Sequence, residues 1–427
     1  MHRVVVTGVG LTTSLGVGAN NCWRKLIAGE NGIRRISFWD PSAYPAKVAG
    51  EVHEAPREIR LNSYPGNYCR RSVRLFIPAA EEAFSDSGIS SASGGEVRDR
   101  GSIGLSCGVS VNYLDMSLMR EYFRQAEPGA FKMDIKRLSE IGDHLPRYTF
   151  FRRQGDTIGA VISRLLKIGG PVLTNDTACA ASAHSIGEAY RMVRRGQVRA
   201  VLAGGAAALV SPLSILAFAI IGALSRSEDP HEASRPFDRN RDGFVMGEGA
   251  GAVVLETLED ARARGAKIYG EIVGFGSSLN AHTLTDPSPG GVAEGRAMQQ
   301  AMDEAKMTPE EVDYIAAHGT STPKNDPTET QAIHAVFPSG RKPLVSSNKG
   351  QIGHTISAAG VCNLVFTLKA MEDQTAPPTM HLKNPDPTCD LDYVPNRSRS
   401  AKIHSALVNA FAFGGQNAVL AVRAQAA

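Results

Sequence analysis

The feature of this sequence that most restricts its fold is an alternation of short apolar runs with helical patterns, which occurs in both halves of the chain. Five runs in each half have the length and composition of buried strands. Apolar residues at helical spacing fill intervals between them, at residues 70–88 and 180–196 and again at 293–305, 327–337 and 358–373. The candidate strands are residues 3–9, 101–106, 170–174, 200–204 and 251–257, then 268–275, 314–317, 344–347, 405–410 and 418–423. This order predicts an α/β fold with an internal duplication.

We expect the two halves to meet near residue 257, giving an N-terminal half of residues 1–257 and a C-terminal half of residues 258–427. The polar stretch 112–155 fits neither half. We therefore expect a lid or a dimer-facing insertion at about residues 110–155.

One stretch, residues 200–225, carries no charge and is long enough to cross a bilayer, which takes about 20 residues. Gly204-Gly205, Ser211-Pro212 and Gly222 divide it into a strand, a turn and a small-residue helix. We therefore expect a buried core or a subunit contact, and no membrane span.

Composition excludes several classes of protein. With 42% hydrophobic and 21% charged residues and a net charge of +3, the 427-residue chain is typical of a globular enzyme and not of a nucleic-acid-binding protein. Its six cysteines form no CxxC pair, so neither a zinc site nor a disulfide framework is indicated. An apolar strand pattern, and no signal-peptide pattern, follows Met1, so we expect a cytoplasmic protein without a metal.

Cys179 lies where a short apolar run gives way to small residues and then to a helical pattern. Residues 174–177 are rich in helix N-cap types, and apolar residues recur at helical spacing until Gly196. A thiol in the first turn of a helix is next to the positive end of the helix dipole, which should lower its pKa and favour the thiolate. Cys179 is therefore a candidate nucleophile, although a small packed cysteine would have the same surroundings.

Two histidines follow candidate strands elsewhere in the chain. His318 comes directly after the run 314–317 and is followed by hydroxyl and carboxylate side chains. His354 ends a glycine-rich turn, five residues after Lys349. Each histidine alone is more often structural, but together with Cys179 they form a set that nucleophilic catalysis could use.

These segments, together with the motifs 4–10, 234–251, 318–323, 348–354 and 413–415, resemble the β-ketoacyl-acyl carrier protein synthases of the elongating type over nearly the whole chain. The resemblance implies a thiolase-like fold in which two duplicated halves form five layers, α-β-α-β-α. It also implies decarboxylative condensation of an acyl-enzyme with malonyl-acyl carrier protein, which yields a 3-oxoacyl-acyl carrier protein. The enzyme would be a homodimer without a cofactor of its own, because the acyl carrier protein brings the phosphopantetheine.

The resemblance also implies roles for individual residues. Cys179 would take up the acyl group, and the backbone N–H groups of Cys179 and Phe413 would form the oxyanion hole. His318 and His354 would stabilise the enolate that decarboxylation of malonyl-carrier produces.

Other residues would support this centre. Lys349 and Glu329 match positions that form an ion pair orienting the His318 loop, with Asp326 as a further support. Thr320 and Thr322 would hold the amides of pantetheine. The remaining implied positions are Phe413 as a gate, Val109 in the acyl pocket, and Arg70, Arg71 and Arg226 on a basic rim for the acidic carrier.

The sequence departs from the family pattern at Lys324-Asn325, at Gln416 and at residues 108–112. All three departures lie near the expected substrate tunnel. The sequence is therefore compatible with a specialised lipid or polyketide pathway as well as with fatty-acid synthesis. One alternative is a chain-length-determining partner subunit, which usually lacks the nucleophile. A degradative thiolase would need a second cysteine, which the loop around Phe413 does not contain. The pair Gly8-Val-Gly10 has no third glycine at the spacing of a dinucleotide-binding loop.

Overall fold

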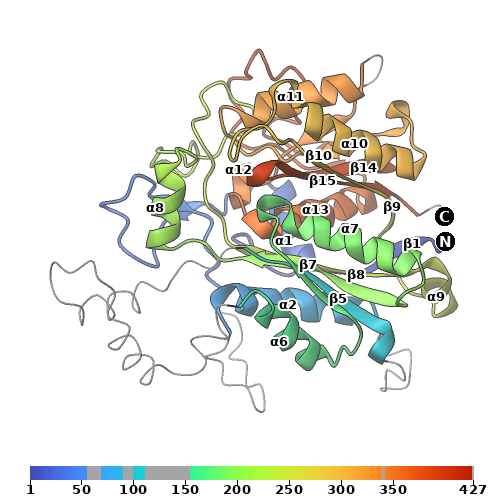
Figure 1. Cartoon of the computed structure of the whole chain (residues 1–427). Helices are drawn as coiled ribbons and strands as arrows, with labels where there is room; N and C mark the ends of the chain where they lie inside the picture. Colours follow the sequence, from blue (N-terminus) through green and yellow to red (C-terminus); the bar gives the residue numbers. More distant parts are fainter. Residues whose placement is uncertain (55–68, 90–99, 111–153, 339–341, 426–427) are drawn as a thin grey trace, which may run out of the picture.

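The computed structural model describes residues 1–54, 69–89, 100–110, 154–338 and 342–425 (Figure 1). The insertion expected at about residues 110–155 lies outside the described residues except at its ends. No described helix combines the length and the apolar character that a membrane span requires.

Each half of the chain contributes five strands, and the two sets have the same topology. In both, the spatial order of the strands, numbered along the chain, is third, second, fourth, fifth, first. The neighbouring pairs made by the fifth strand are antiparallel and the other two pairs are parallel. The strands are β1 (Val4–Thr13), β5 (Ile103–Gly108), β6 (Val172–Asn175), β7 (Ala200–Ala207) and β8 (Gly249–Thr257), then β9 (Gly270–Leu279), β10 (Tyr314–Ala316), β11 (Leu344–Ser346), β14 (Ser405–Phe411) and β15 (Gln416–Arg423). The predicted α/β duplication is thereby confirmed.

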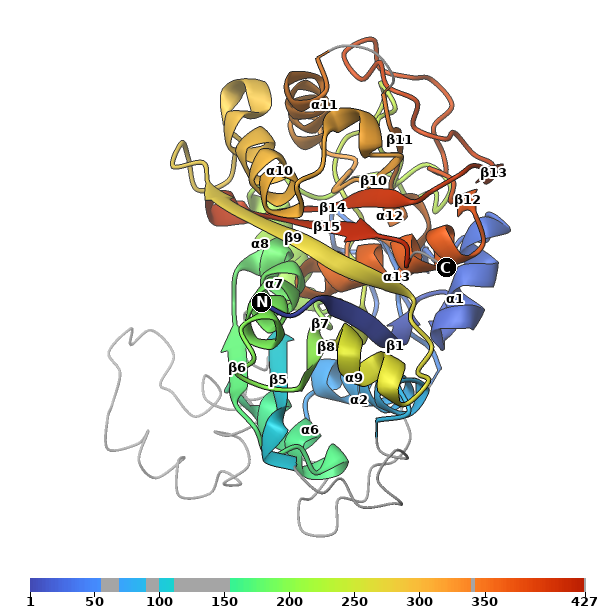
Figure 2. The same ribbon diagram turned by 90° about the vertical axis from the view of Figure 1, so that its right-hand side faces the viewer.

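The first strands of the two halves pair with each other. Residues Val4 to Val6 of β1 lie antiparallel to Ile272 to Gly270 of β9, so the strands of the two halves form one continuous, strongly twisted sheet (Figure 2). The largest core cluster of the described residues therefore runs through both halves.

Helices form three layers around and between the two sets of strands (Figure 1). α2 (Arg71–Asp86) and α6 (Thr157–Leu166) cover the outer face of the N-terminal half, and α10 (Val292–Ala305) and α11 (Asn325–Val336) cover that of the C-terminal half. Between the halves lie α7 (Ala181–Arg194) and α13 (Ala359–Glu372), which contact each other. Every residue of α13 except Glu372 is buried, because strands lie on both sides of this helix.

Glycine pairs allow an outer helix to approach the first strand of each half. A Cβ at Gly8 or Gly10 of β1 would lie 2.0 Å from a backbone carbonyl oxygen of α2. A Cβ at Gly274 or Gly276 of β9 would likewise lie within 2.1 Å of a backbone carbonyl oxygen of α10. The Gly8-Val-Gly10 motif is therefore a close-packing device that the duplication repeats.

The remaining elements are short. The uncharged stretch 200–225 forms β7, a turn and α8 (Pro212–Ile220), and the Ser211 hydroxyl accepts a hydrogen bond from the Ser214 amide at the start of this helix. This arrangement confirms the division of the stretch into strand, turn and helix. The other described elements are α1 (Ala19–Ile27), α9 (Leu258–Ala263), α12 (Lys349–Ile352), β2 (Gly16–Val17), β3 (Arg34–Arg35), β4 (Val48–Ala49), β12 (Thr375–Ala376) and β13 (Arg399–Ser400).

Candidate active site

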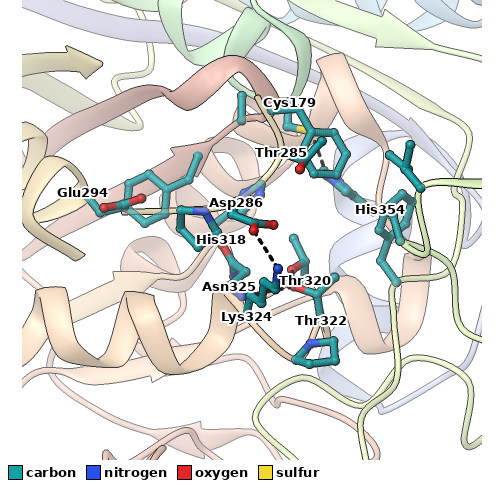
Figure 3. A pocket seen from close by; sticks show the side chains of 18 of the residues that line it. Cys179, Thr285, Asp286, Glu294, His318, Thr320, Thr322, Lys324, Asn325 and His354 are labelled. Carbon is teal, nitrogen blue, oxygen red and sulfur yellow. Dashed lines mark hydrogen bonds and ion pairs between the residues drawn. The ribbon is translucent and has the colours of Figure 1, made fainter. Parts of the chain in front are cut away.

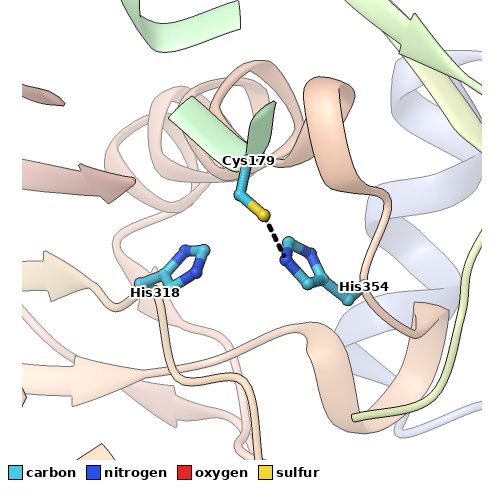
Figure 4. A group of neighbouring side chains, drawn as sticks. All are labelled: Cys179, His318 and His354. Carbon is cyan, nitrogen blue, oxygen red and sulfur yellow. Dashed lines mark hydrogen bonds between the residues drawn. The ribbon is translucent and has the colours of Figure 1, made fainter. Parts of the chain in front are cut away.

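Three side chains from distant parts of the sequence converge at the boundary between the halves (Figure 4). Cys179 lies in a short turn (Ala178–Ala180) that leads from β6 into α7, and His318 follows β10. His354 lies between α12 and α13. Nε2 of His354 is 3.1 Å from Sγ of Cys179, and the two imidazole rings are 5.2 Å apart at an angle of 82°. The structure therefore brings the three predicted residues together.

The Cys179 thiol is buried, and burial raises its pKa to about 11. The charge of Lys349 and the backbone N–H groups of Phe413 and Cys179 lower the pKa, but by less than burial raises it. The expectation of a lowered pKa was therefore wrong, because a thiolate in this enclosed position loses its hydration. Cys179 needs a base to remove its proton, and the imidazole of His354 is placed to act as one.

Both imidazoles are neutral at physiological pH. Burial and the nearby charge of Lys349 hold the pKa of His318 and that of His354 well below their usual range. A neutral imidazole carries one donor and one acceptor nitrogen, so each ring can take up a proton or donate a hydrogen bond. Nδ1 of each ring has no hydrogen-bond partner among the described residues.

Lys349 and Glu329 hold the backbone at His318 from two sides. The Lys349 ammonium donates a hydrogen bond to the carbonyl oxygen of His318. The Glu329 carboxylate accepts hydrogen bonds of 2.8 Å from the amides of His318 and Gly319, and one of 2.9 Å from the side chain of Asn409. The two side chains thus do not form the direct ion pair that the resemblance implied, because the peptide they orient occupies the space between them. Burial lowers the pKa of Lys349 to about 8, and the nearby Glu329 opposes this shift.

Asp326 supports the loop that follows His318. Its buried carboxylate accepts hydrogen bonds from the amide of Ser321 and from that of Phe237, at 3.2 and 2.8 Å. The guanidinium of Arg241 lies 3.8 Å away. Asp326 therefore ties this loop to the segment before β8.

A cavity of about 260 Å³ opens in front of Cys179 (Figure 3). Thr320 and Thr322 line it, with their hydroxyl oxygens 2.9 Å apart, and so does Phe413. Val109 does not line this cavity; it is buried in the core cluster that also includes residues of α2 and α6.

The sequence patterns missed a group of lining residues in the segment after β9 and in the first turn of α10. Thr285, Asp286 and Glu294 line the cavity, and Oδ2 of Asp286 lies 2.6 Å from Nζ of Lys324 on the opposite wall (Figure 3). His318 was selected because it lies in a polar stretch that follows a strand. The same criterion would have selected the polar stretch after β9. Lys324, seen in the sequence only as a departure from the family, therefore belongs to the site.

The Phe413 loop contacts the segment after β9 through its backbone. The amide of Gly414 donates a hydrogen bond of 2.8 Å to the carbonyl oxygen of Leu284. In the other direction, the amide of Asn280 donates one of 2.9 Å to the carbonyl oxygen of Gly415. The half-buried ring of Phe413 stacks on Phe218 of α8, with ring centroids 6.3 Å apart.

The three arginines expected on a basic rim have different environments. Arg70 is buried, and burial lowers its pKa to about 10. Arg71 forms an ion pair of 2.7 Å with Glu248, and Arg226 is exposed. Of the three, Arg226 has the most accessible side chain.

Comparisons with known proteins agree with this geometry. Family models described as the N-terminal and the C-terminal domain of beta-ketoacyl synthases match residues 1–261 and 269–383. The chain is 37% identical to 3-oxoacyl-[acyl-carrier-protein] synthase 2 of Coxiella burnetii over 423 residues, covering 98% of both chains. It is 38% identical to the protein of the same name from Synechocystis over 431 residues, covering 99% of this chain and 98% of the relative.

Solved structures are similar over the full length. A beta-ketoacyl synthase from Burkholderia phymatum has a TM-score of 0.87 at 32% identity, and both chains are covered completely. A ketosynthase solved in complex with its type II polyketide acyl-carrier protein has a TM-score of 0.86 at 30% identity, covering 99% of this chain and 100% of the other.

Proposed function

The chain belongs to the beta-ketoacyl synthase family, and we propose that it condenses an acyl group carried on Cys179 with malonyl-acyl carrier protein to form 3-oxoacyl-acyl carrier protein. The observation that carries this proposal is the 3.1 Å contact between Sγ of Cys179 and Nε2 of His354 at the end of a cavity that His318 also lines. The product would serve fatty-acid synthesis or a specialised lipid or polyketide pathway.

In the first step, Cys179 accepts the acyl group. His354 takes the thiol proton, and the resulting thiolate attacks the carbonyl carbon of an acyl thioester on the carrier's phosphopantetheine. The backbone N–H groups of Cys179 and Phe413, which already point at the sulfur, stabilise the oxyanion. The pantetheine thiolate leaves and recovers the proton from His354.

In the second step, the malonyl thioester loses carbon dioxide and becomes an enolate. Neutral His318 and His354, the latter now in the tautomer with its proton on Nε2, donate hydrogen bonds to its oxygen, and each such donor is worth about 3 kcal/mol of barrier. The enolate carbon attacks the acyl carbon on Cys179, and the Cys179 thiolate leaves and takes up a proton from solvent, which restores the thiol. No electron acceptor or donor is required.

Lys349 and Glu329 act as positioning residues in this proposal. Their hydrogen bonds to the carbonyl and amide of His318 fix the backbone from which the imidazole projects. Since a donor that is fixed beforehand costs no reorganisation during the reaction, the two side chains support both steps from outside the cavity.

The carrier's arm would enter along the cavity wall formed by Thr320 and Thr322, whose hydroxyls can bind its amides. Arg226, exposed after α8, would face the acidic carrier, with the partly exposed Arg71 as a further member of the rim. The buried Arg70 is not accessible to the carrier.

We further propose that the enzyme is a homodimer. Strand β6 pairs only with β5 among the described strands, and its Val172 and Leu173 are 44% and 43% exposed. Leu216 and Ile220 of α8 are also exposed. An apolar edge strand is an aggregation hazard unless it is paired, and a second copy of the same strand would pair with it.

Mass spectrometry tests the proposed reaction. Incubation with acyl-carrier substrates of graded length should add the acyl mass to Cys179, and malonyl-carrier should then release carbon dioxide and a β-ketoacyl product. A Cys179→Ala variant should accept no acyl group. If the wild-type enzyme is not acylated at any chain length, the proposal fails, and the chain would be a non-catalytic partner subunit.

A further inference from the structure

We propose that Cys179, His318 and His354 together bind a zinc ion, and that this metal reversibly blocks the nucleophile. Sγ of Cys179 and one ring nitrogen from each histidine lie within 4.8 Å of one another, and all three side chains are buried. This inference uses the geometry of the centre and does not require the proposed reaction.

The separations fit a tetrahedral zinc ion after small side-chain rotations. Zn–S and Zn–N bonds of about 2.3 and 2.0 Å place neighbouring ligand atoms roughly 3.3–3.6 Å apart. The observed Sγ to Nε2 distance is 3.1 Å. The cavity of about 260 Å³ leaves room for a water molecule as the fourth ligand. Thiolate and imidazole are also the ligands that favour zinc over magnesium or calcium.

The surroundings indicate a removable ion and not a permanent structural one. In resident zinc centres, the second nitrogen of each histidine usually donates to a carboxylate or a carbonyl oxygen. Here, Nδ1 of His318 and Nδ1 of His354 have no partner among the described residues. The rings are therefore held less firmly than in a structural site, and we expect chelators to remove the metal.

Binding would exchange a proton for the metal. The thiol proton of Cys179 leaves to solvent, the Zn–S bond forms, and the two neutral imidazoles each give one lone pair. No oxidation occurs, so Cys179 is restored when the metal leaves. The metal would occupy the sulfur lone pair that attacks an acyl thioester.

Cobalt provides a spectroscopic test that is independent of activity. We expect one equivalent of Co²⁺ to give the visible spectrum of a tetrahedral site with a sulfur-to-cobalt charge-transfer band, and Zn²⁺ to displace it. Cys179→Ser should lose the band, and His318→Ala or His354→Ala should weaken binding about tenfold or more. Zn²⁺ should also protect Cys179 from iodoacetamide, and EDTA should end that protection.

His334 serves as a matched control, because it contacts the Asp390 carboxylate at 2.5 Å on the surface and could bind metal there. His334→Ala should leave the cobalt spectrum unchanged. A spectrum that survives Cys179→Ser but is lost in His334→Ala would overturn the proposal, as would the absence of a charge-transfer band in the wild-type enzyme. An enzyme that binds cobalt but condenses nothing would refute only the proposed function.

Discussion

Cys179 and His354 occupy equivalent junctions of the two halves, and their side chains meet. Each residue lies between the third strand of its half and the central helix that follows, β6 and α7 for Cys179 and β11 and α13 for His354. Both junctions contain a tight turn that begins with a residue other than glycine at positive φ, Ala178 at 47° and Ile356 at 42°. The internal symmetry thus places a thiol and its base face to face.

This contact predicts different defects for the two histidines. His354→Asn should slow acylation of Cys179 by about 10²–10⁴-fold, because it removes the base that lies 3.1 Å from the sulfur. His318→Asn should leave acylation nearly intact but slow decarboxylation. Quenched-flow mass spectrometry of the acyl-enzyme and measurement of released carbon dioxide would separate the two steps. Equal loss of acylation in both variants would contradict the assignment.

The lowered pKa of Lys349, about 8, predicts a pH-dependent contribution to stability. Below pH 8 the ammonium is charged in both folded and unfolded chains, so its burial opposes folding in full. Between pH 8 and the ordinary value of 10.5, the unfolded chain binds the proton and the folded one does not, so this opposition is lost as the pH rises. Urea denaturation should show the stability of the wild type rising relative to Lys349→Met between pH 7.5 and 10.

Glu329→Gln should destabilise the fold and impair the positioning of His318. The glutamine loses one of the two oxygens that accept the amides of His318 and Gly319, and hydrogen bonds to a charged group contribute about 2 kcal/mol each. We expect kcat to fall while the KM for malonyl-carrier changes little. An unchanged kcat in a variant that is destabilised would limit Glu329 to a structural role.

The ion pair between Lys324 and Asp286 should restrain the Phe413 loop. Asp286 belongs to the same segment as Leu284, whose carbonyl oxygen accepts a hydrogen bond from the Gly414 amide. Loss of the ion pair should therefore loosen both this segment and the Phe413 loop. Asp286→Asn should therefore increase hydrolysis of the acyl-enzyme severalfold. The pair is exposed and is worth less than about 1 kcal/mol, so the melting temperature should hardly change.

The ion pair between Lys383 and Glu232 is a control for this experiment, because it is similarly exposed and neither residue lines the cavity. Glu232→Gln should have no effect on hydrolysis. Hydrolysis unchanged in Asp286→Asn would show that the ion pair does not restrain the loop.

The exposed edge of β6 predicts the oligomeric state. Leu173→Asp places a charge on this apolar strand and should convert a dimer into a monomer in light scattering, while Leu284→Asp, at a still more exposed apolar residue in the segment after β9, should not. A wild-type enzyme that is monomeric at micromolar concentration would refute the proposed dimer.

The sequence was sufficient to predict the ten main strands of the two halves because their apolar runs are local signals. It singled out His318 and His354 because each lies in a polar or glycine-rich segment that follows such a run. The pKa of Cys179 could not be predicted from the helix start alone, because the burial that raises it comes from distant segments, such as those that carry Phe244 and Ile356 of the same core cluster. The Lys324 to Asp286 contact spans 38 residues and depends on how two loops face each other across the cavity. Patterns along the chain carry no such information.

The pairing of β1 with β9 has a consequence for the biosynthesis of this enzyme. Among the described strands, only three residue pairs connect the two halves, from Val4 to Val6 against Ile272 to Gly270. Cys179 is synthesised long before His354, so an emerging N-terminal half has the thiol without its base. The centre that joins Sγ of Cys179 to Nε2 of His354 is therefore complete only after the second half has been synthesised and has docked on the first.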